Sequence, residues 1–203
     1  MTWTVFVEGG GTGKDLRTRC REGFAQFLGR LNLAGGRPKI VACGPREDAF
    51  RRLCIALDDD ATGSYLLLVD SEAVVSAGVP VWKHVREREG DNWQRPVNAK
   101  DEHLHFMAVC MESWLVSDPE SLGRFYGKNF TSNALPQPAD LESVDKYTVM
   151  RALRSATRDT SKGEYSKGKV SFAALGAIDV SVVSQRMSFC RRLAQQLEKA
   201  VEL

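Results

Sequence analysis

The sequence predicts an α/β fold, in which a central, mostly parallel, Rossmann-like sheet is flanked by helices. Two observations carry this prediction. Strand-like and helix-like segments alternate from residue 2 to residue 70, and the segment SYLLLVD at 64–70 is an unbroken apolar run. Such alternation is typical of parallel strands joined by right-handed crossovers. A strand that is apolar throughout is covered on both faces, as it is in the middle of a parallel sheet.

The first two strand–helix units are well marked. TWTVFVE is rich in β-branched and aromatic residues and predicts a strand that ends near Glu8. From Lys14 the apolar residues recur with the period of a helix, and PKIVAC at 38–43 predicts the second strand. Pro45 suits the first turn of a second helix over 45–59. The buried stripe of the first helix is expected to be Leu16, Cys20, Phe24, Phe27, Leu28 and Leu31.

The rest of the chain is less regular. We expect a short helix and a polar loop at 79–96, a fourth strand in HLHFMAVC, and a helix that begins near Ser117 or Asp118. NALPQPADLES reads as a linker. It is followed by a helix from about Val144 to Ala156, a basic loop up to Phe172 and one terminal helix with an apolar stripe. The predicted organisation is a core over 1–135 and a C-terminal helical extension over 136–203, packed together as one compact unit. The stripe of the terminal helix consists of Val183, Met187, Cys190, Ala194, Leu197 and Val201.

Composition narrows the class of protein. The chain has 203 residues, 43% of them hydrophobic and 27% charged, which is ordinary for a globular domain. It has no apolar run of 18 residues, so we expect no membrane-spanning helix and no membrane partner. Five scattered cysteines without a CxxC pair indicate reduced thiols, and no export signal is visible, so we expect a cytoplasmic protein. The net charge of +2 neither requires nor excludes a nucleic-acid partner.

The glycine-rich stretch EGGGTGKD does not fit a phosphate-binding loop. A Walker A loop needs a glycine five residues before its Gly-Lys pair and a Ser or Thr after it. In this chain Glu8 and Asp15 stand at those two places. We therefore expect Gly9, Gly10 and Gly11 to provide unusual backbone dihedrals and clearance in front of Glu8.

Three acidic residues are predicted to meet at one edge of the sheet. Glu8 ends the first strand, while Asp70 and Glu72 follow the third, and parallel strands end at the edge where ligands bind in such folds. In an extended backbone residues 70 and 72 point the same way. Three carboxylates without His or Cys favour Mg²⁺ or Mn²⁺, because hard oxygen donors prefer these ions. A solvated turn is the simpler alternative for Glu8.

Other residues are weaker candidates. Glu112 follows the predicted fourth strand and can reach the same edge, and Asp118 is either a further ligand or a helix cap. The basic segment 151–169 is compatible with a clamp for a nucleic-acid backbone or with a solvated loop. Its proposed nucleic-acid-binding residues are Lys162, Tyr165, Lys167 and Lys169.

These motifs carry a resemblance. A strand ending in Glu and glycine, followed by a later strand ending in Asp-Ser-Glu, resembles the Toprim domain of topoisomerases, primases and overcoming-lysogenization-defect nucleases. Toprim domains usually have Asp-x-Asp at the second place. The segments VEGGGTGKDLRTRCREGFAQFL, VDSE, MESWLVSDPE and YSKGKVSFAAL together are similar to an uncharacterised Toprim-like bacterial family, often encoded beside ABC- or AAA-type ATPases in suspected phage-defence loci.

The resemblance implies a metal-dependent nuclease acting on DNA or RNA, the effector of an ATPase-coupled anti-phage system. Glu8 would be the general acid/base, and Asp70 and Glu72 would hold the metal. The alternative is a non-catalytic Toprim-like regulatory subunit that binds an ATPase partner or a nucleotide. A homo-oligomer is compatible with either interpretation.

Overall fold

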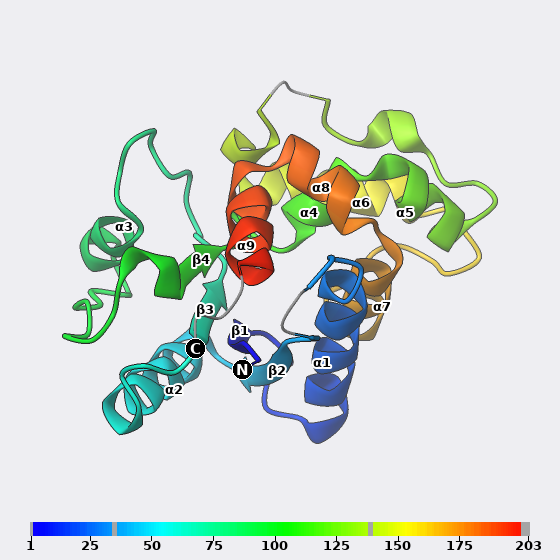
Figure 1. Cartoon of the computed structure of the whole chain (residues 1–203). Coiled ribbons are helices and arrows are strands. Elements are labelled where there is room, and N and C mark those ends of the chain that lie inside the picture. The colour runs from blue at the N-terminus through cyan, green and yellow to red at the C-terminus, as the bar shows by residue number, and fades with distance from the viewer. Residues whose placement is uncertain (1, 34–35, 138–139, 200–203) are drawn as a thin grey trace.

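The fold is centred on a parallel β-sheet. The computed structural model describes residues 2–33, 36–137 and 140–199. Within those ranges the sheet has four strands in the order β2-β1-β3-β4, and every neighbouring pair is parallel. The predicted α/β, Rossmann-like fold is therefore confirmed (Figure 1). The strands are β1 (Thr4–Glu8), β2 (Lys39–Gly44), β3 (Tyr65–Val69) and β4 (Leu104–Phe106).

Helices connect the strands and form a C-terminal elaboration. The connecting helices are α1 (Lys14–Leu28), α2 (Arg46–Asp59) and α3 (Val81–Glu87). After the sheet come α4 (Glu112–Ser117), α5 (Pro119–Tyr126), α6 (Lys146–Thr157), α7 (Lys169–Ala177), α8 (Val180–Arg186) and α9 (Ser188–Glu198). Short 3₁₀ turns lie at Asp101–His103, Ser132–Ala134 and Leu141–Ser143.

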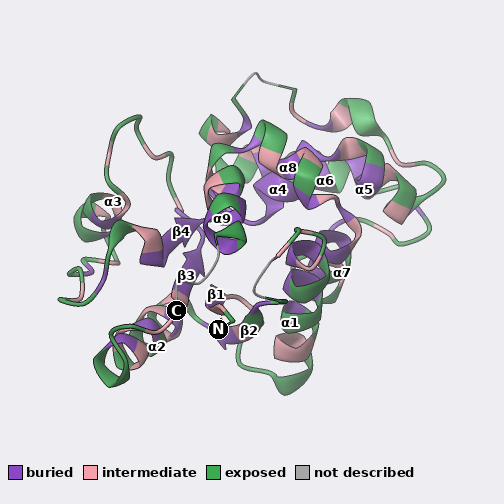
Figure 2. Ribbon diagram, viewed as in Figure 1, coloured by how far each residue is buried: buried purple, intermediate pink, exposed green. Residues whose placement is uncertain are grey.

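The two faces of the sheet bury separate groups of apolar side chains. Alternate residues of β1 point to opposite faces, so Val5 and Val7 lie on one side and Phe6 on the other. The first side is covered by α1 and the C-terminal helices, whereas α2 and α3 cover the second. The buried strands at the centre are clear in Figure 2. The apolar run at 64–70 behaves as predicted, because both faces of β3 are covered.

The C-terminal extension packs directly on the first helix. In α1, a Cβ at Gly23 would lie 2.4 Å from the carbonyl oxygen of Phe172 in α7, so only glycine allows the two helices to come this close. On β4, Arg192 of α9 donates to the Leu104 carbonyl at 2.7 Å. Residues from both ends of the sequence therefore build one side of the molecule.

The C-terminal region departs from the prediction in two ways. The basic loop ends at Gly168, because Lys169–Ala177 forms α7 and its apolar residues pack on α1. The predicted single terminal helix is broken at Met187, whose φ of −123° and ψ of 114° are extended. Arg191 donates to the carbonyls of Ser184 and Gln185 and so satisfies the end of α8. Val201, the last residue of the predicted stripe, lies outside the described residues.

Two further expectations concern membranes and thiols. No helix in the described ranges combines the length and apolar character needed to span a bilayer. The five cysteines are free, and four of them are buried. Burial raises the pKa of Cys20, Cys110 and Cys190 to about 12, which keeps these thiols protonated and unreactive.

Candidate metal-binding site

Glu8 stands where β1 leaves the sheet. The pairing of β1 with β2 shifts between Val7 and Glu8, and Gly9 then forms an isolated antiparallel bridge with Gly44. Gly9 has φ of +136° and Gly10 has φ of +84°, dihedrals that favour glycine. A Cβ at Gly10 would lie 2.8 Å from Cα of Arg17, so the predicted need for glycine in this turn is borne out by the backbone.

Asp70 and Glu72 follow β3 in a strained turn. The backbone N–H groups of Ser71 and Glu72 donate to the carbonyls of Ala108 and Val109, at 2.7 and 3.1 Å. Glu72 has φ of +60°, which is uncommon for a residue with a side chain. The prediction that residues 70–72 are extended is therefore wrong, although the carboxylates of Asp70 and Glu72 do come together as expected. Strain of this kind is often found at functional sites.

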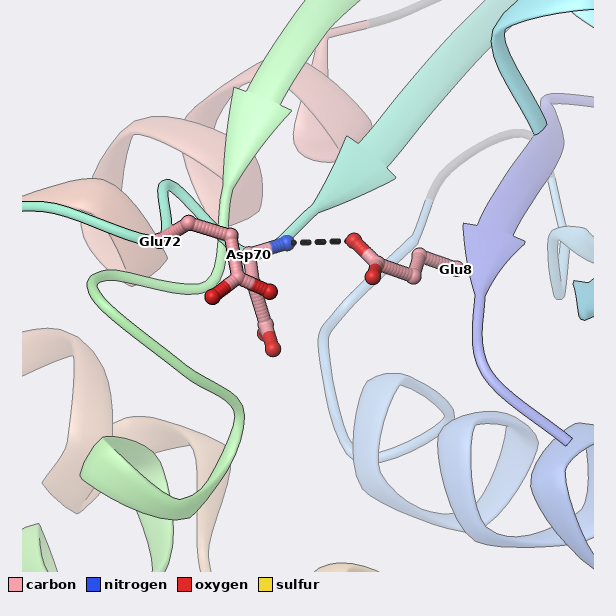
Figure 3. Close-up of side chains that lie close together, drawn as sticks. All are labelled: Glu8, Asp70 and Glu72. Atoms are coloured by element: carbon pink, nitrogen blue, oxygen red, sulfur yellow. Dashed lines mark hydrogen bonds between the residues drawn. The ribbon is translucent and has the colours of Figure 1, made fainter. Parts of the chain in front are cut away.

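The three predicted carboxylates form a cluster. One oxygen of each of Glu8, Asp70 and Glu72 lies within 4.8 Å of the others. Figure 3 shows them converging from the ends of β1 and β3, with Oε2 of Glu8 accepting the backbone N–H of Asp70 at 3.1 Å. On the other side, Oδ1 of Asp70 accepts the N–H of Met111 at 2.8 Å. Backbone donors thus orient two of the three acids.

Burial makes the ionised cluster costly. Asp70 is buried, and this burial, together with the charges of Glu8 and Glu112, raises its pKa well above the usual value. Burial also raises the pKa of Glu8, against the opposing effects of Arg46 and of the Asp70 N–H. A cation among these carboxylates would stabilise their charged forms.

Two basic side chains already contact the cluster, and the sequence analysis identified neither. Nζ of Lys146 lies 2.7 Å from Oε2 of Glu72 and 4.0 Å from Oδ2 of Asp70. Burial acts to lower the pKa of Lys146, but the hydrogen bond with Glu72 and the nearby carboxylates outweigh it and raise that pKa. Lys146 begins α6 in the C-terminal extension, behind the N-cap Asp145.

Arg46 is the second of these side chains, at the start of α2. Its guanidinium lies 3.7 Å from Oε2 of Glu8 and donates to the Asp70 carbonyl at 3.0 Å. It is held in place by Asp91 at 2.8 Å and by the ring of Trp93, whose centroid lies 4.9 Å away. Pro45 marked the helix start in the sequence, but no local pattern distinguished Arg46 from the other arginines of α2.

Glu112 lies next to the cluster but belongs to a different network. It is buried at the start of α4, where Oε1 accepts the hydroxyl of Tyr165 at 2.8 Å. Within the described ranges its Oε2 accepts no hydrogen bond, although Nζ of Lys167 lies 3.5 Å away. Among the described residues, the cluster of possible metal ligands does not include Glu112. Its charge nevertheless reaches Asp70.

Asp118 has the geometry of a helix cap. Its Oδ1 accepts the N–H of Ser121 at 3.1 Å, and its Oδ2 accepts the N–H of Asp179 at 2.9 Å. With Pro119 at the first helical position, Asp118 begins α5. Both carboxylate oxygens are occupied and buried, and the structure does not bring this residue to the cluster.

The four predicted nucleic-acid-binding residues do not form one surface. Tyr165 is 1% exposed and points to Glu112, so its ring is not available for stacking. Lys162 lies over the ring of Phe125 at 5.1 Å, and Lys169 pairs with Asp15 at 3.3 Å. Lys167, like Tyr165, reaches the neighbourhood of the acids through Glu112. The burial of Tyr165 was hidden in the sequence by its polar neighbours.

A cavity of about 220 Å³ adjoins the cluster. Its walls come from the glycine turn, from Glu8 and Asp70, and from the start of α7. Apolar side chains of Met107, Met111 and Phe172 line it as well. The glycines therefore leave open space directly beside two of the carboxylates.

The donor set fits a hard divalent cation. Glu8, Asp70 and Glu72 supply carboxylate oxygens only, the ligands that Mg²⁺ and Mn²⁺ prefer. The buried Asp70 carboxylate needs positive charge nearby, and Lys146, at 4.0 Å, meets that need only in part.

Comparison with known proteins identifies the family. The family model described as Domain of unknown function (DUF4276) matches residues 7–198. This covers nearly the whole chain, and the chain belongs to that family. No curated protein and no solved structure gives a significant match.

Proposed function

We propose that this member of the DUF4276 family is a Mg²⁺- or Mn²⁺-dependent nuclease that cleaves phosphodiester bonds in DNA or RNA. The observation that carries the proposal is the approach of three carboxylates, from two neighbouring strands, to within 4.8 Å at the carboxyl edge of a parallel sheet. Ligands bind at this edge in open α/β sheets. Metal ions held by carboxylates serve phosphoryl chemistry in many enzymes.

Each acid has its own role in the proposal. Asp70 and Glu72 hold the metal, which when bound orients the phosphate and lowers the pKa of a water molecule. Glu8 takes up or releases a proton, or shares the ion. Its raised pKa, caused mainly by burial, moves its titration toward neutral pH, where a general acid or base is most effective.

The Toprim-like resemblance also suggests a location, a partner and a biological role for the proposed nuclease. It suggests a cytoplasmic effector of an ATPase-coupled anti-phage system, with an ABC- or AAA-type ATPase as the partner. The free, mostly buried cysteines agree with a reducing compartment.

A second candidate is a non-catalytic regulatory subunit that binds an ATPase or a nucleotide. The observation that favours it is the presence of Lys146 and Arg46 beside the acids, because internal cations reduce the need for a metal. In this alternative the cluster is an ion-pair network that fixes the C-terminal extension to the sheet.

Two measurements distinguish the nuclease from the regulatory subunit. They are calorimetric titration of the whole chain with Mn²⁺ and a cleavage assay on labelled DNA and RNA. The nuclease proposal expects Mn²⁺ binding at one site and metal-dependent cleavage. Asp70→Asn should abolish both, and Glu8→Gln should abolish cleavage. Glu120→Gln is the matched control, since this exposed acid lies outside the cluster and pairs with Arg124. Undiminished cleavage by both site variants, or a protein that binds no Mn²⁺, would rule the nuclease out.

A further inference from the structure

A large cavity follows the β2 edge of the sheet, away from the carboxylates. It has a volume of about 650 Å³ and lies along β2, between α1 and α2. Four basic side chains line it, and no Asp or Glu does: Arg17 and Arg21 come from α1, Lys39 from β2 and Arg52 from α2. The whole chain has a net charge of only +2, so this is a local concentration of positive charge.

These four cations are unpaired within the part of the chain that the structure describes. Within the described residues none of them forms an ion pair, whereas their neighbours Arg19 and Arg51 pair with Asp15 and Asp48. Arg21 bonds only the hydroxyl of Thr18, and Arg17 donates to a backbone carbonyl. Unpaired cations of one sign in a groove raise the local concentration of anions.

Protection of the sheet edge does not explain this arrangement. A charged residue on an edge strand prevents pairing with other chains, and Lys39 fulfils that role. The arginines come from helices on opposite faces of the sheet and point to the same groove. An arginine fork is suited to phosphate oxygens.

One residue of the groove contacts the glycine turn of the candidate metal site. Nε of Arg17 donates to the carbonyl of Gly11 at 3.0 Å, and Gly11 belongs to the glycine turn that follows Glu8. The wall of the groove includes Lys39, Ile40, Val41 and Ala42 of β2, which together span about 13 Å at about 3.3 Å per residue.

We infer that the β2 groove, formed by Arg17, Arg21, Lys39 and Arg52, binds the phosphodiester backbone of a single nucleic-acid strand. The choice of nucleic acid over other polyanions rests on the proposed nuclease function. The cavity has the volume of a pocket for a small molecule, which suits one strand better than a duplex. Tyr65, half-buried in the wall, adds an aromatic surface for a base.

Fluorescence anisotropy with a labelled 20-nucleotide strand, in EDTA and over a range of salt, tests the inference. Four phosphate contacts predict a slope of log K against log salt of about −3, since each contributes about 0.7. The variant Arg21→Gln/Lys39→Gln/Arg52→Gln should lose about 2 from the slope and roughly a hundredfold in affinity at about 0.1 M salt. The control Lys83→Gln/Arg86→Gln/Arg124→Gln removes as many charges far from the groove.

The outcomes separate this inference from the nuclease proposal. Glu8→Gln should bind the strand as the wild type does, and the groove variant should keep its Mn²⁺ affinity, which also shows that it is folded. Equal losses in the groove and control variants would overturn the inference. The inference would also be overturned if an oligoglutamate of the same charge bound as tightly as the oligonucleotide.

Discussion

Lys146 donates a hydrogen bond of 2.7 Å to Glu72, across 74 positions of sequence. The contact ties the first turn of α6 to the turn after β3, and it places an ammonium group beside a candidate metal ligand. A metal and this ammonium group would compete for Glu72, because both need the same carboxylate.

Replacing Lys146 by Met should therefore increase the affinity for Mn²⁺. The pair is partly exposed, so we expect a gain of about fivefold, which corresponds to about 1 kcal/mol. Calorimetry on the wild type, Lys146→Met and the charge-preserving Lys146→Arg measures it. Weaker Mn²⁺ binding in the Met variant than in the Arg variant would show that the ammonium organises the site rather than competing for it.

Asp118 should contribute to stability without affecting metal binding. Asp118→Ala removes the acceptor for two backbone N–H groups and should lower the free energy of unfolding by about 2 kcal/mol. Urea unfolding measures this loss. Mn²⁺ affinity should stay unchanged in the folded variant, and a large loss of affinity would restore Asp118 as a candidate ligand.

The glycine turn should tolerate substitution at one position and not at another. Gly10→Ala places a Cβ 2.8 Å from Cα of Arg17 at a positive φ, and we expect a loss of at least about 1 kcal/mol. Gly13 has φ of −80° and no atom within 4 Å of an added Cβ, so Gly13→Ala should be nearly neutral. Thermal unfolding of the two variants compares them directly, and similar melting temperatures would contradict the turn geometry.

His105 should make the fold sensitive to mild acid. Its Nε2–H donates to the Glu102 carbonyl, and the buried Nδ1 has no partner among the described residues, so a second proton finds no acceptor there. Burial lowers the pKa of His105 from 6.5 to about 3. Because the folded pKa is the lower one, this residue's contribution to stability is complete above about pH 6.5 and decreases as the pH falls toward 3.

The decrease should be about 2 kcal/mol between about pH 7.5 and pH 5, since each pH unit below 6.5 costs about 1.4 kcal/mol. Urea unfolding of the wild type and His105→Gln at both pH values isolates the effect. The variant should lose less stability than the wild type on acidification, and an equal loss in both proteins would refute this explanation.

The strands and the acidic cluster could be predicted from the sequence because both depend on local pattern and strand order. The apolar run before Asp70 identified a central strand, and the end of β1 placed Glu8 at the same edge. The cations could not be predicted, because Lys146 reaches Glu72 only through the packing of the C-terminal extension. Tyr165 was wrongly assigned to a nucleic-acid-binding surface because its sequence neighbours are polar. Its own side chain is buried.

Glu72 and Lys146 are far apart in the sequence, and this matters while the chain is being made on the ribosome. A ribosome adds about 5–20 residues per second, so the lysine follows the glutamate by on the order of 4–15 s. Arg46 precedes both Asp70 and Glu72 and is available to Glu8 at once. During that interval Glu72 lacks its intramolecular partner, and an ion from the surrounding solution meets no rival for it. The proposed metal would therefore meet no competing ammonium group at Glu72 until α6 has been made.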